Sequence, residues 1–122
     1  MKTISSIKPE RFRQILFPDN QPHIVIDDVL PGDQIRVVHP IRSSLELVQL
    51  LLICNAIKHA GATPIELVIP YLMGARYDRI INPGDSFDVE VVADCINMLG
   101  FQHVHLFDAH SPVATKLIKN SK

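Results

Sequence analysis

Short apolar runs alternate along this chain with longer segments in which apolar residues recur at helical spacing. Four runs rich in β-branched residues predict strands, at His23–Ile26, Gln34–Val38, Ile65–Ile69 and His103–Phe107. A Pro-Gly-Asp turn signal at 31–33 separates the first two runs. From the second run onward the order is strand, helix, strand, helix, strand, which indicates right-handed crossovers and a parallel sheet. We therefore expect a single α/β domain over residues 1–122, with three layers and a mainly parallel sheet.

The segment between the second and third runs predicts a helix over Ser44–Ala60. Ser43 followed by Glu46 fits a capping box, and Gly61 stands where a helix-ending glycine belongs. Apolar residues cover nearly the whole circumference of this helix, which indicates burial on more than one side. In so small a domain, the second side suggests a subunit interface, so we expect a homo-oligomer.

Two later segments also predict helical structure. Apolar residues recur at helical spacing over Phe87–Leu99, directly before Gly100. Residues Val113–Ile118 predict one last helical turn. A long loop, Tyr71–Asp85, precedes the first of these helices.

Composition excludes several classes of protein. The formal net charge is −1 and there is no basic run, which argues against a nucleic-acid partner. No apolar stretch approaches the roughly 20 residues that span a bilayer, and the start of the chain lacks the apolar region of a signal peptide. Cys54 and Cys95 have no metal-ligand spacing and fit small core residues in a reducing compartment. We expect a cytoplasmic protein without membrane contact.

Two segments that each follow a predicted strand carry the candidate chemistry. Pro70–Arg79 follows the third run and Asp108–Pro112 the fourth, and parallel strands deliver such segments to one edge of the sheet. Arginine forks such as Arg76 bind phosphate oxygens, and Tyr77 can stack on a base. This combination suits a nucleoside triphosphate with Mg²⁺, although a solvated loop with surface arginines fits the same spacing. No Walker-type phosphate loop is present in the sequence.

Asp108 and His110 form the candidate metal site. Because one residue separates them, an extended backbone points both side chains the same way, where they can share a divalent ion or its water ligands. The alternative is an Asp that caps the short helix near Pro112, with a hydrogen-bonded His beside it, and spacing alone slightly favours this alternative. His103 and His105 also alternate on one strand and leave a zinc site as a minor alternative. The other three histidines, His23, His39 and His59, have no evident chemical neighbours in the sequence.

The chain resembles the amino-terminal domain of ribose-phosphate pyrophosphokinases. Phe17–Gln21 is similar to the family's Phe-Ser-Asp-Gly-Glu, and Ser44–Leu47 to its Asn-Leu-Met-Glu-Leu helix. Pro70–Arg79 resembles Pro-Tyr-Phe-Gly-Tyr-Ala-Arg-Gln-Asp-Arg, and Asp108–Pro112 resembles Asp-Leu-His-Ala-Pro. The resemblance covers about Phe17 to Ile118.

The resemblance implies a phosphoribosyltransferase-like half that takes part in transferring the β,γ-diphosphate of ATP to ribose 5-phosphate. Arg76 and Tyr77 fall on the family's ATP-contacting Arg-Gln pair. His110, with Asp108 beside it, falls on the family's magnesium-binding His. The implied cofactor is therefore Mg²⁺, and the implied partner is ATP. Ribose 5-phosphate would bind only where a second domain is supplied, because the family's ribose-phosphate and catalytic loops have no counterpart in these 122 residues.

The segment Phe17–Gln21 implies an additional contact with ATP. Phe17, Asp19 and Gln21 fall on the part of the family that reaches the adenine of a neighbouring subunit, which again implies an oligomer. Three departures stand beside this agreement. Tyr77 replaces a Gln, Gln21 replaces a Glu, and residues 80–85 replace a basic loop.

Three interpretations remain open on the sequence. We favour the ATP-binding half of a synthetase, although this chain alone is expected to lack full activity. The second is a non-catalytic regulatory homologue that assembles with true synthetases. The third is an unrelated small α/β binding domain whose motifs match by chance.

Overall fold

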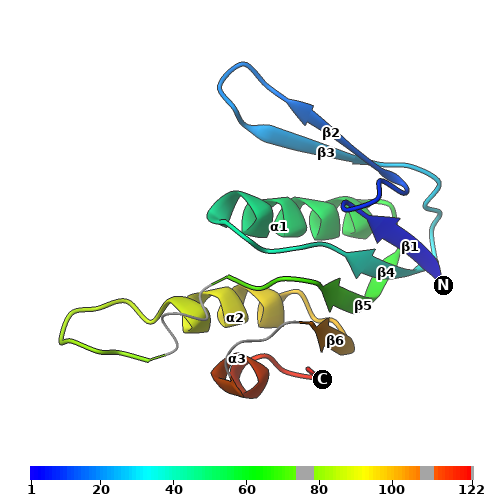
Figure 1. Cartoon of the computed structure of the whole chain (residues 1–122). Helices are drawn as coiled ribbons and strands as arrows, with labels where there is room; N and C mark the ends of the chain where they lie inside the picture. Colours follow the sequence, from blue (N-terminus) through cyan, green and yellow to red (C-terminus); the bar gives the residue numbers. More distant parts are fainter. Residues whose placement is uncertain (74–78, 108–111, 122) are drawn as a thin grey trace.

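The computed structural model describes residues 1–73, 79–107 and 112–121, and it confirms an α/β fold (Figure 1). Four strands form a wholly parallel sheet in the order β1-β4-β5-β6, and β2 and β3 form a separate antiparallel hairpin. The strands are β1 (Lys2–Ser5), β2 (Phe12–Leu16), β3 (Pro22–Ile26), β4 (Gln34–Val38), β5 (Thr63–Ile69) and β6 (His103–Leu106). The helices are α1 (Ser44–His59), α2 (Asp88–Met98) and α3 (Pro112–Leu117).

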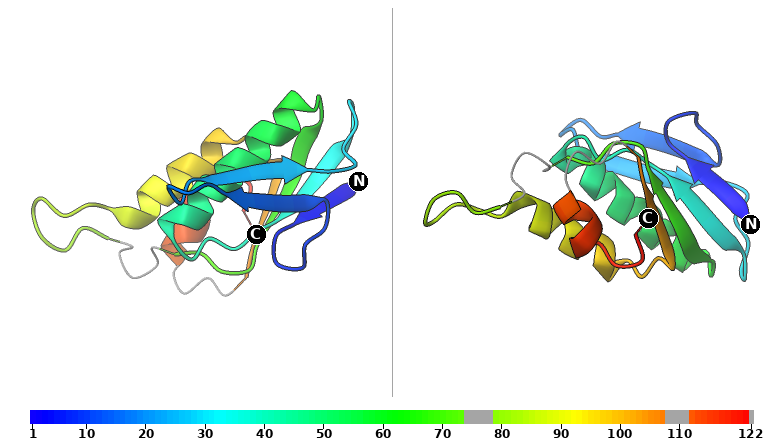
Figure 2. Two further views of the ribbon diagram at one scale, coloured as in Figure 1. Left: turned by 90° about the horizontal axis from the view of Figure 1, so that it is seen from above. Right: turned by 60° about the horizontal axis from the view of Figure 1, so that its bottom comes forward.

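Helices and hairpin are stacked on one side of the sheet. Helix α1 connects β4 to β5 and α2 connects β5 to β6, and the two helices lie side by side on the same face (Figure 2). Right-handed crossovers that proceed in one direction across a sheet produce this arrangement. The hairpin lies over α1, which β3 contacts directly. The layers are therefore hairpin, helix and sheet where α1 is covered.

Helices α1 and α2 and strands β4, β5 and β6 begin and end within two residues of the bounds that the sequence pattern predicted. The first third of the chain differs from the prediction. The pattern did not predict β1 or β2. The run His23–Ile26 is a strand, as predicted, but it pairs with β2 in the hairpin rather than with the parallel sheet. Residues 6–9 form turns, and Glu10 then makes an isolated antiparallel bridge with Ser5.

The core lies between the sheet and the two long helices. Alternate residues of β4 and β5 and Val104 of β6 are buried, as are the inward residues of α1 and α2. Cys54 belongs to this core, where burial raises the pKa of its thiol to about 12, which confirms the prediction for Cys54, whereas Cys95 is only partly buried. The main core residues are Ile35, Val37, Leu67, Ile69, Val104, Leu50, Ile53, Ile57, Val89, Val92 and Ile96.

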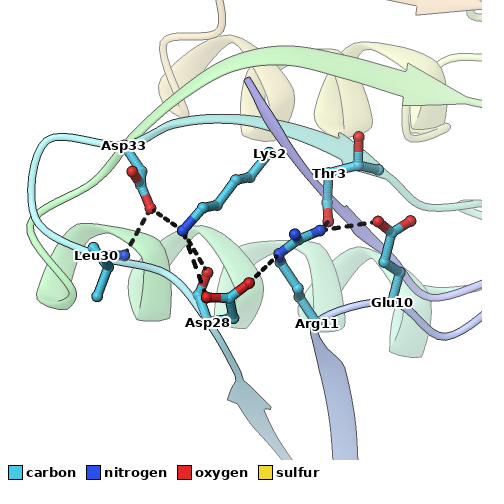
Figure 3. Close-up of polar contacts among 7 residues, drawn as sticks. All are labelled: Lys2, Thr3, Glu10, Arg11, Asp28, Leu30 and Asp33. Carbon is cyan, nitrogen blue, oxygen red and sulfur yellow. Dashed lines mark hydrogen bonds and ion pairs between the residues drawn. The ribbon is translucent and has the colours of Figure 1, made fainter.

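Partly buried ion pairs tie the start of β1 to the segment that joins the hairpin to β4 (Figure 3). Lys2 Nζ lies 2.9 Å from Asp33 Oδ2, and Asp33 Oδ2 also accepts a bond from the Leu30 N–H. This contact with Lys2 lowers the pKa of Asp33 and raises that of Lys2. Arg11 bonds Asp28, Glu10 and the Thr3 carbonyl. The network holds the base of the hairpin against the first strand.

Candidate functional site at the carboxyl edge of the sheet

The carboxyl ends of β5 and β6 lie next to each other, as the parallel arrangement predicts. Ile69 pairs with Leu106, and the Phe107 N–H donates to the Ile69 carbonyl at 3.1 Å. Pro70 and Phe107 therefore leave the sheet at the same edge. The predicted site residues that follow them, Arg76, Tyr77, Asp108 and His110, lie outside the described residues.

The segment after β5 is tied to the segment after β4. The Ile41 N–H donates to the Tyr71 carbonyl at 2.8 Å, and the Met73 N–H donates to the Ile41 carbonyl at 2.6 Å. These two bonds hold Tyr71 and Met73, at the start of the run toward Arg76, beside Ile41 of the segment that follows β4.

The predicted adenine-contacting residues Phe17, Asp19 and Gln21 lie together in the turn of the hairpin. The Asn20 N–H donates to the Phe17 carbonyl, and Asp19 Oδ1 accepts from the Gln21 N–H at 3.0 Å. The Phe17 ring is 46% exposed and packs against His23, with ring centroids 5.7 Å apart. Figure 1 shows this turn on the same side of the molecule as the amino-terminal end of α1. An exposed aromatic ring on a hydrogen-bonded turn is accessible to another molecule.

A cavity of about 570 Å³ lies at the carboxyl ends of β1, β4 and β5, beside the start of α1. The hairpin strand β2 and the first turns of α1 complete its walls. The residues that matter for its chemistry are Ser6, Phe12, Gln14, His39, Gln49 and Tyr71. Sequence reasoning missed this cavity.

His39 is the buried polar residue of the cavity, with 1% of its surface exposed. Its Nε2 lies 2.7 Å from the Glu46 carbonyl oxygen, which can only accept, so Nε2 carries the proton. Its Nδ1 is then the acceptor for the Ser6 hydroxyl at 2.6 Å. Burial lowers the pKa of His39, which favours this neutral form. The hydrogen-bonded series Ser6–His39–Glu46 joins the end of β1, the end of β4 and the start of α1.

Arg42 and Glu46 form a bidentate ion pair at the rim of the cavity. Arg42 Nε and Nη2 lie 2.8 and 2.7 Å from the two carboxylate oxygens of Glu46. The hydrogen bond from Arg42 is the main cause that lowers the pKa of Glu46. The pair orients the guanidinium and closes the amino-terminal end of α1.

One signal in the sequence identifies His39, and the sequence analysis did not use it. His39 directly follows β4, so it occupies the same carboxyl edge as the motifs after β5 and β6. Its partner Ser6 lies 33 positions earlier, after a strand that the pattern did not predict. Without β1 the pair could not be recognised.

His105 of the zinc alternative is engaged elsewhere. His105 Nε2 lies 2.6 Å from Glu66 Oε1, and Arg36 Nε lies 3.0 Å from the other oxygen of Glu66. Arg36 is the main cause that lowers the pKa of Glu66. Within residues 1–73, 79–107 and 112–121, no three His, Cys, Asp or Glu side chains are grouped so that they could hold a metal ion.

Among the residues that the structure describes, no helix has the length and apolar character needed to cross a membrane.

Comparison with known proteins identifies the family. Residues 3–100 match the model of the N-terminal domain of ribose phosphate pyrophosphokinase. A ribose-phosphate pyrophosphokinase of Methanosarcina acetivorans is 32% identical over 81 residues, covering 66% of this chain and 28% of that protein. One from Helicobacter hepaticus is 31% identical over 97 residues, covering 78% of this chain and 31% of the relative. The chain thus spans about a third or less of the length of these relatives.

The fold agrees with a solved structure. The phosphoribosylpyrophosphate synthetase of Mycobacterium smegmatis superposes with a TM-score of 0.77 over 90% of this chain and 38% of its own, at 19% identity. At that identity the likeness speaks for the fold alone. Together with the match over residues 3–100, it shows that the chain belongs to the ribose-phosphate pyrophosphokinase family and corresponds to its amino-terminal domain.

Proposed function

We propose that this chain is the ATP-binding half of a ribose-phosphate diphosphokinase, which transfers diphosphate from ATP to ribose 5-phosphate for nucleotide biosynthesis. Family membership supports the proposed activity, and one observation supports the location of the site. Because β5 and β6 are neighbouring parallel strands, the segments that lead to Arg76 and to His110 begin at one edge of the sheet. Positioning and charge neutralisation are what a diphosphoryl transfer requires of a protein.

Each predicted residue has a role in this proposal. Arg76 donates to phosphate oxygens and Tyr77 packs against the nucleotide. Asp108 and His110 would hold Mg²⁺ or its water ligands, since a carboxylate and an imidazole leave room for water and phosphate oxygens in the shell of the ion. The bound ion would offset the charge of the triphosphate. Ribose 5-phosphate enters the proposal only together with a second domain.

Two further features support the proposal. The hairpin turn bears on contact with a neighbouring subunit, and the free cysteines bear on the location of the protein. Phe17, with Asp19 and Gln21 beside it, would contact the adenine held by a neighbouring subunit, and its exposure on a hydrogen-bonded turn supports this role. Cys54 and Cys95 are free thiols, which fits a cytoplasmic location where thiols stay reduced.

A regulatory homologue is the second candidate, and residues 80 and 81 favour it. Ile80 and Ile81 are 60% and 66% exposed, in the loop where the resemblance leads one to expect basic residues. An exposed apolar pair is better suited to a protein contact than to phosphate binding. Binding to a catalytic synthetase without any affinity for ATP would favour this candidate over the first.

Titration calorimetry with ATP, in the presence and absence of Mg²⁺, tests the proposed function. Arg76→Ala should remove a charge-assisted contact of about 1.5–3 kcal/mol. His110→Ala should abolish most of the Mg²⁺ dependence and leave metal-free binding little changed. Lys58→Ala, which removes an exposed cation from the last turn of α1, is the control and should bind like the wild type. Equal affinity in all four proteins, with and without Mg²⁺, would exclude Arg76 and His110 from a nucleotide site.

A further inference from the structure

We propose that Ser6 and His39 form a second catalytic site, in which Ser6 is a nucleophile toward small carboxylic esters and His39 is its general base. The two residues meet in the cavity of about 570 Å³ beside the start of α1. Neither residue is among those to which the proposed function assigns ATP or Mg²⁺, so the inference does not rest on that function. It gives this domain a hydrolytic activity of its own.

The fold places the two residues at the ends of neighbouring strands. Ser5 pairs with Val38 in the parallel sheet, and the next residue along each strand belongs to the proposed site. The Ser6 N–H donates to the Val38 carbonyl at 3.1 Å. The His39 N–H donates to the Val68 carbonyl of β5, also at 3.1 Å. Hydrogen bonds thus hold both backbones at the carboxyl edge of the sheet, where α/β proteins carry functional residues.

The side-chain bonds of His39 are those of a base beside a nucleophile. Its Nδ1 accepts from the Ser6 hydroxyl at 2.6 Å, and its Nε2–H donates to the Glu46 carbonyl at 2.7 Å. Nucleophilic hydrolases share this arrangement, in which the base bonds the nucleophile on one side and an orienting group on the other. Here a backbone carbonyl orients the imidazole. Within the described residues, the Ser6 hydroxyl makes no other side-chain hydrogen bond, so its lone pairs are available for attack.

The groups around His39 keep the ring neutral and ready to accept a proton. Burial is the main cause that lowers the pKa of His39, so Nδ1 is unprotonated at neutral pH. The Glu46 backbone and carboxylate oppose this shift and stabilise an imidazolium, whereas the Arg42 guanidinium acts in the opposite sense. A base with a pKa below the working pH attracts the proton less strongly, so we expect slow turnover.

The cavity gives a small ester access to Ser6. Its volume lies within the roughly 300–1,000 Å³ typical of small-molecule sites. Phe12 and Tyr71 provide apolar surface for an acyl or aryl group. Gln14 Oε1 accepts a bond from Gln49, and in the part of the chain that the structure describes the NH₂ group of Gln14 has no partner. A donor of this kind stabilises the oxyanion that forms when an ester carbonyl is attacked.

The proposed reaction is hydrolysis through an acyl-serine. Ser6 Oγ forms a bond to the carbonyl carbon while its proton passes to His39 Nδ1, and the C=O electron pair moves onto the carbonyl oxygen. When that pair returns, the C–O bond to the alcohol breaks, and the alcohol leaves with the proton from His39. A water molecule then repeats both steps on the acyl-serine, which releases the carboxylic acid and restores Ser6 and His39.

Diisopropyl fluorophosphate tests the nucleophile, because an activated serine oxygen displaces its fluoride and forms a stable adduct. With the 122-residue chain we expect one adduct, located at Ser6 by peptide mass spectrometry, and none in Ser6→Ala. The matched control is Ser44→Ala, which removes an exposed serine at the start of α1 and should be labelled at the wild-type rate. The absence of an adduct, or an equal adduct in Ser6→Ala, would overturn the assignment.

The pH dependence of labelling tests the base. With His39 as general base, the rate should be level from about pH 7 to pH 9, because the imidazole is already neutral. His39→Gln should slow labelling at pH 7 by about 100-fold. A glutamine can accept from Ser6 and donate to the Glu46 carbonyl, so it can keep both bonds without acting as a base. His59→Gln, which removes an exposed imidazole from α1, is the control and should be labelled like the wild type.

The wild type alone tests the role of His39 if His39→Gln does not fold. A serine without a base reacts through its alkoxide, so a wild-type rate that rises about tenfold per pH unit between pH 7 and pH 9 would overturn the proposal. Equal rates in the wild type and a folded His39→Gln would do the same.

Hydrolysis of 4-nitrophenyl acetate tests the substrate class. It should fall about tenfold or more in Ser6→Ala. Equal hydrolysis by both proteins would overturn the esterase activity. The experiment contains neither ATP nor Mg²⁺, so its failure leaves the proposed function standing. Conversely, ATP binding that ignores Arg76→Ala and His110→Ala would leave this site standing.

Discussion

A single buried side chain, His39, joins three elements of the fold. Its two ring nitrogens bond Ser6 and the Glu46 carbonyl, so a change in its protonation affects β1, β4 and α1 together. Protonation would place a second donor opposite the Ser6 hydroxyl and a charge in an apolar site. The neutral ring is therefore part of the folded structure.

This arrangement predicts an acid sensitivity of stability. Because burial lowers the pKa of His39 in the folded state, the unfolded chain binds more protons below about pH 6.5, and the free energy of unfolding falls as the pH decreases. One proton corresponds to a slope of at most about 1.4 kcal/mol per pH unit. His39→Gln should reduce this slope between about pH 6.5 and pH 5. Urea unfolding across the pH range measures it.

His59→Gln is the control for this experiment, since His59 is exposed in the last turn of α1. It should retain the slope of the wild type. An unchanged slope in His39→Gln would mean that His39 does not govern the acid response. The sequence could not have predicted this residue's role, because its two bonds reach across 33 and 7 positions and depend on the packed fold.

At the scale of elements, α1 is the best predicted part of the chain. Its apolar pattern, the cap Ser43 and the helix-ending Gly61 all appear in the structure, and Gly61 has the positive φ of 78° that such a position requires. The capping box is only half formed. Ser43 Oγ accepts from the Glu46 N–H. The Glu46 carboxylate, however, accepts from the Arg42 N–H rather than from the Ser43 N–H.

The cap predicts a modest stability change. The Ser43 Oγ to Glu46 N distance is 3.4 Å, a long bond, so Ser43→Ala should cost about 0.5–1 kcal/mol, the lower part of the range for such caps. Ser44→Ala, one position further along and exposed, should be neutral or slightly stabilising because alanine favours helices. Urea unfolding of both variants measures the difference. Equal stabilities would show that Ser43 does not act as a cap.

Strands β1 and β2 show where pattern-based prediction fails. β1 has only four residues and begins with the polar Lys2 and Thr3, so it is too short to show an alternation of apolar and polar positions. β2 is mostly exposed, without apolar and polar residues in strict alternation, and it pairs with β3 over five positions. Tertiary pairing rather than local preference decides such strands. The cavity depends on both, so it could not be found from the sequence.

At the scale of the whole molecule, alternating elements predicted a mainly parallel sheet, but they predicted neither its edge strand β1 nor the position of the hairpin. The two helices share one face and α1 is covered by the hairpin, yet apolar residues remain exposed on both helices. Val48 is 40% exposed on α1, and Met98 is 74% exposed on α2. Leu45, one helical turn before Val48, is 47% exposed, so α1 presents neighbouring apolar side chains that a protein contact would bury.

We therefore predict a homodimer or larger assembly. Sedimentation at micromolar concentration should show species heavier than the 13.7 kDa monomer. Val48→Glu should shift the distribution toward monomer, because it places a charge in the contact. Thr115→Glu adds the same charge to an exposed position of α3 and should leave assembly unchanged. A wild type that sediments only as monomer would contradict both the interface and the adenine contact by a neighbour's Phe17.

The last prediction concerns turnover by these 122 residues alone. The matched residues correspond to the amino-terminal domain of the family and to 28–31% of the length of two relatives, and the proposed function assigns ribose 5-phosphate to a second domain. Transfer requires both substrates to be held in line, and binding ATP alone does not supply that alignment. We expect no release of AMP that depends on both ATP and ribose 5-phosphate, even where calorimetry detects Mg²⁺-ATP binding. Robust release by this chain would mean that it positions both substrates itself.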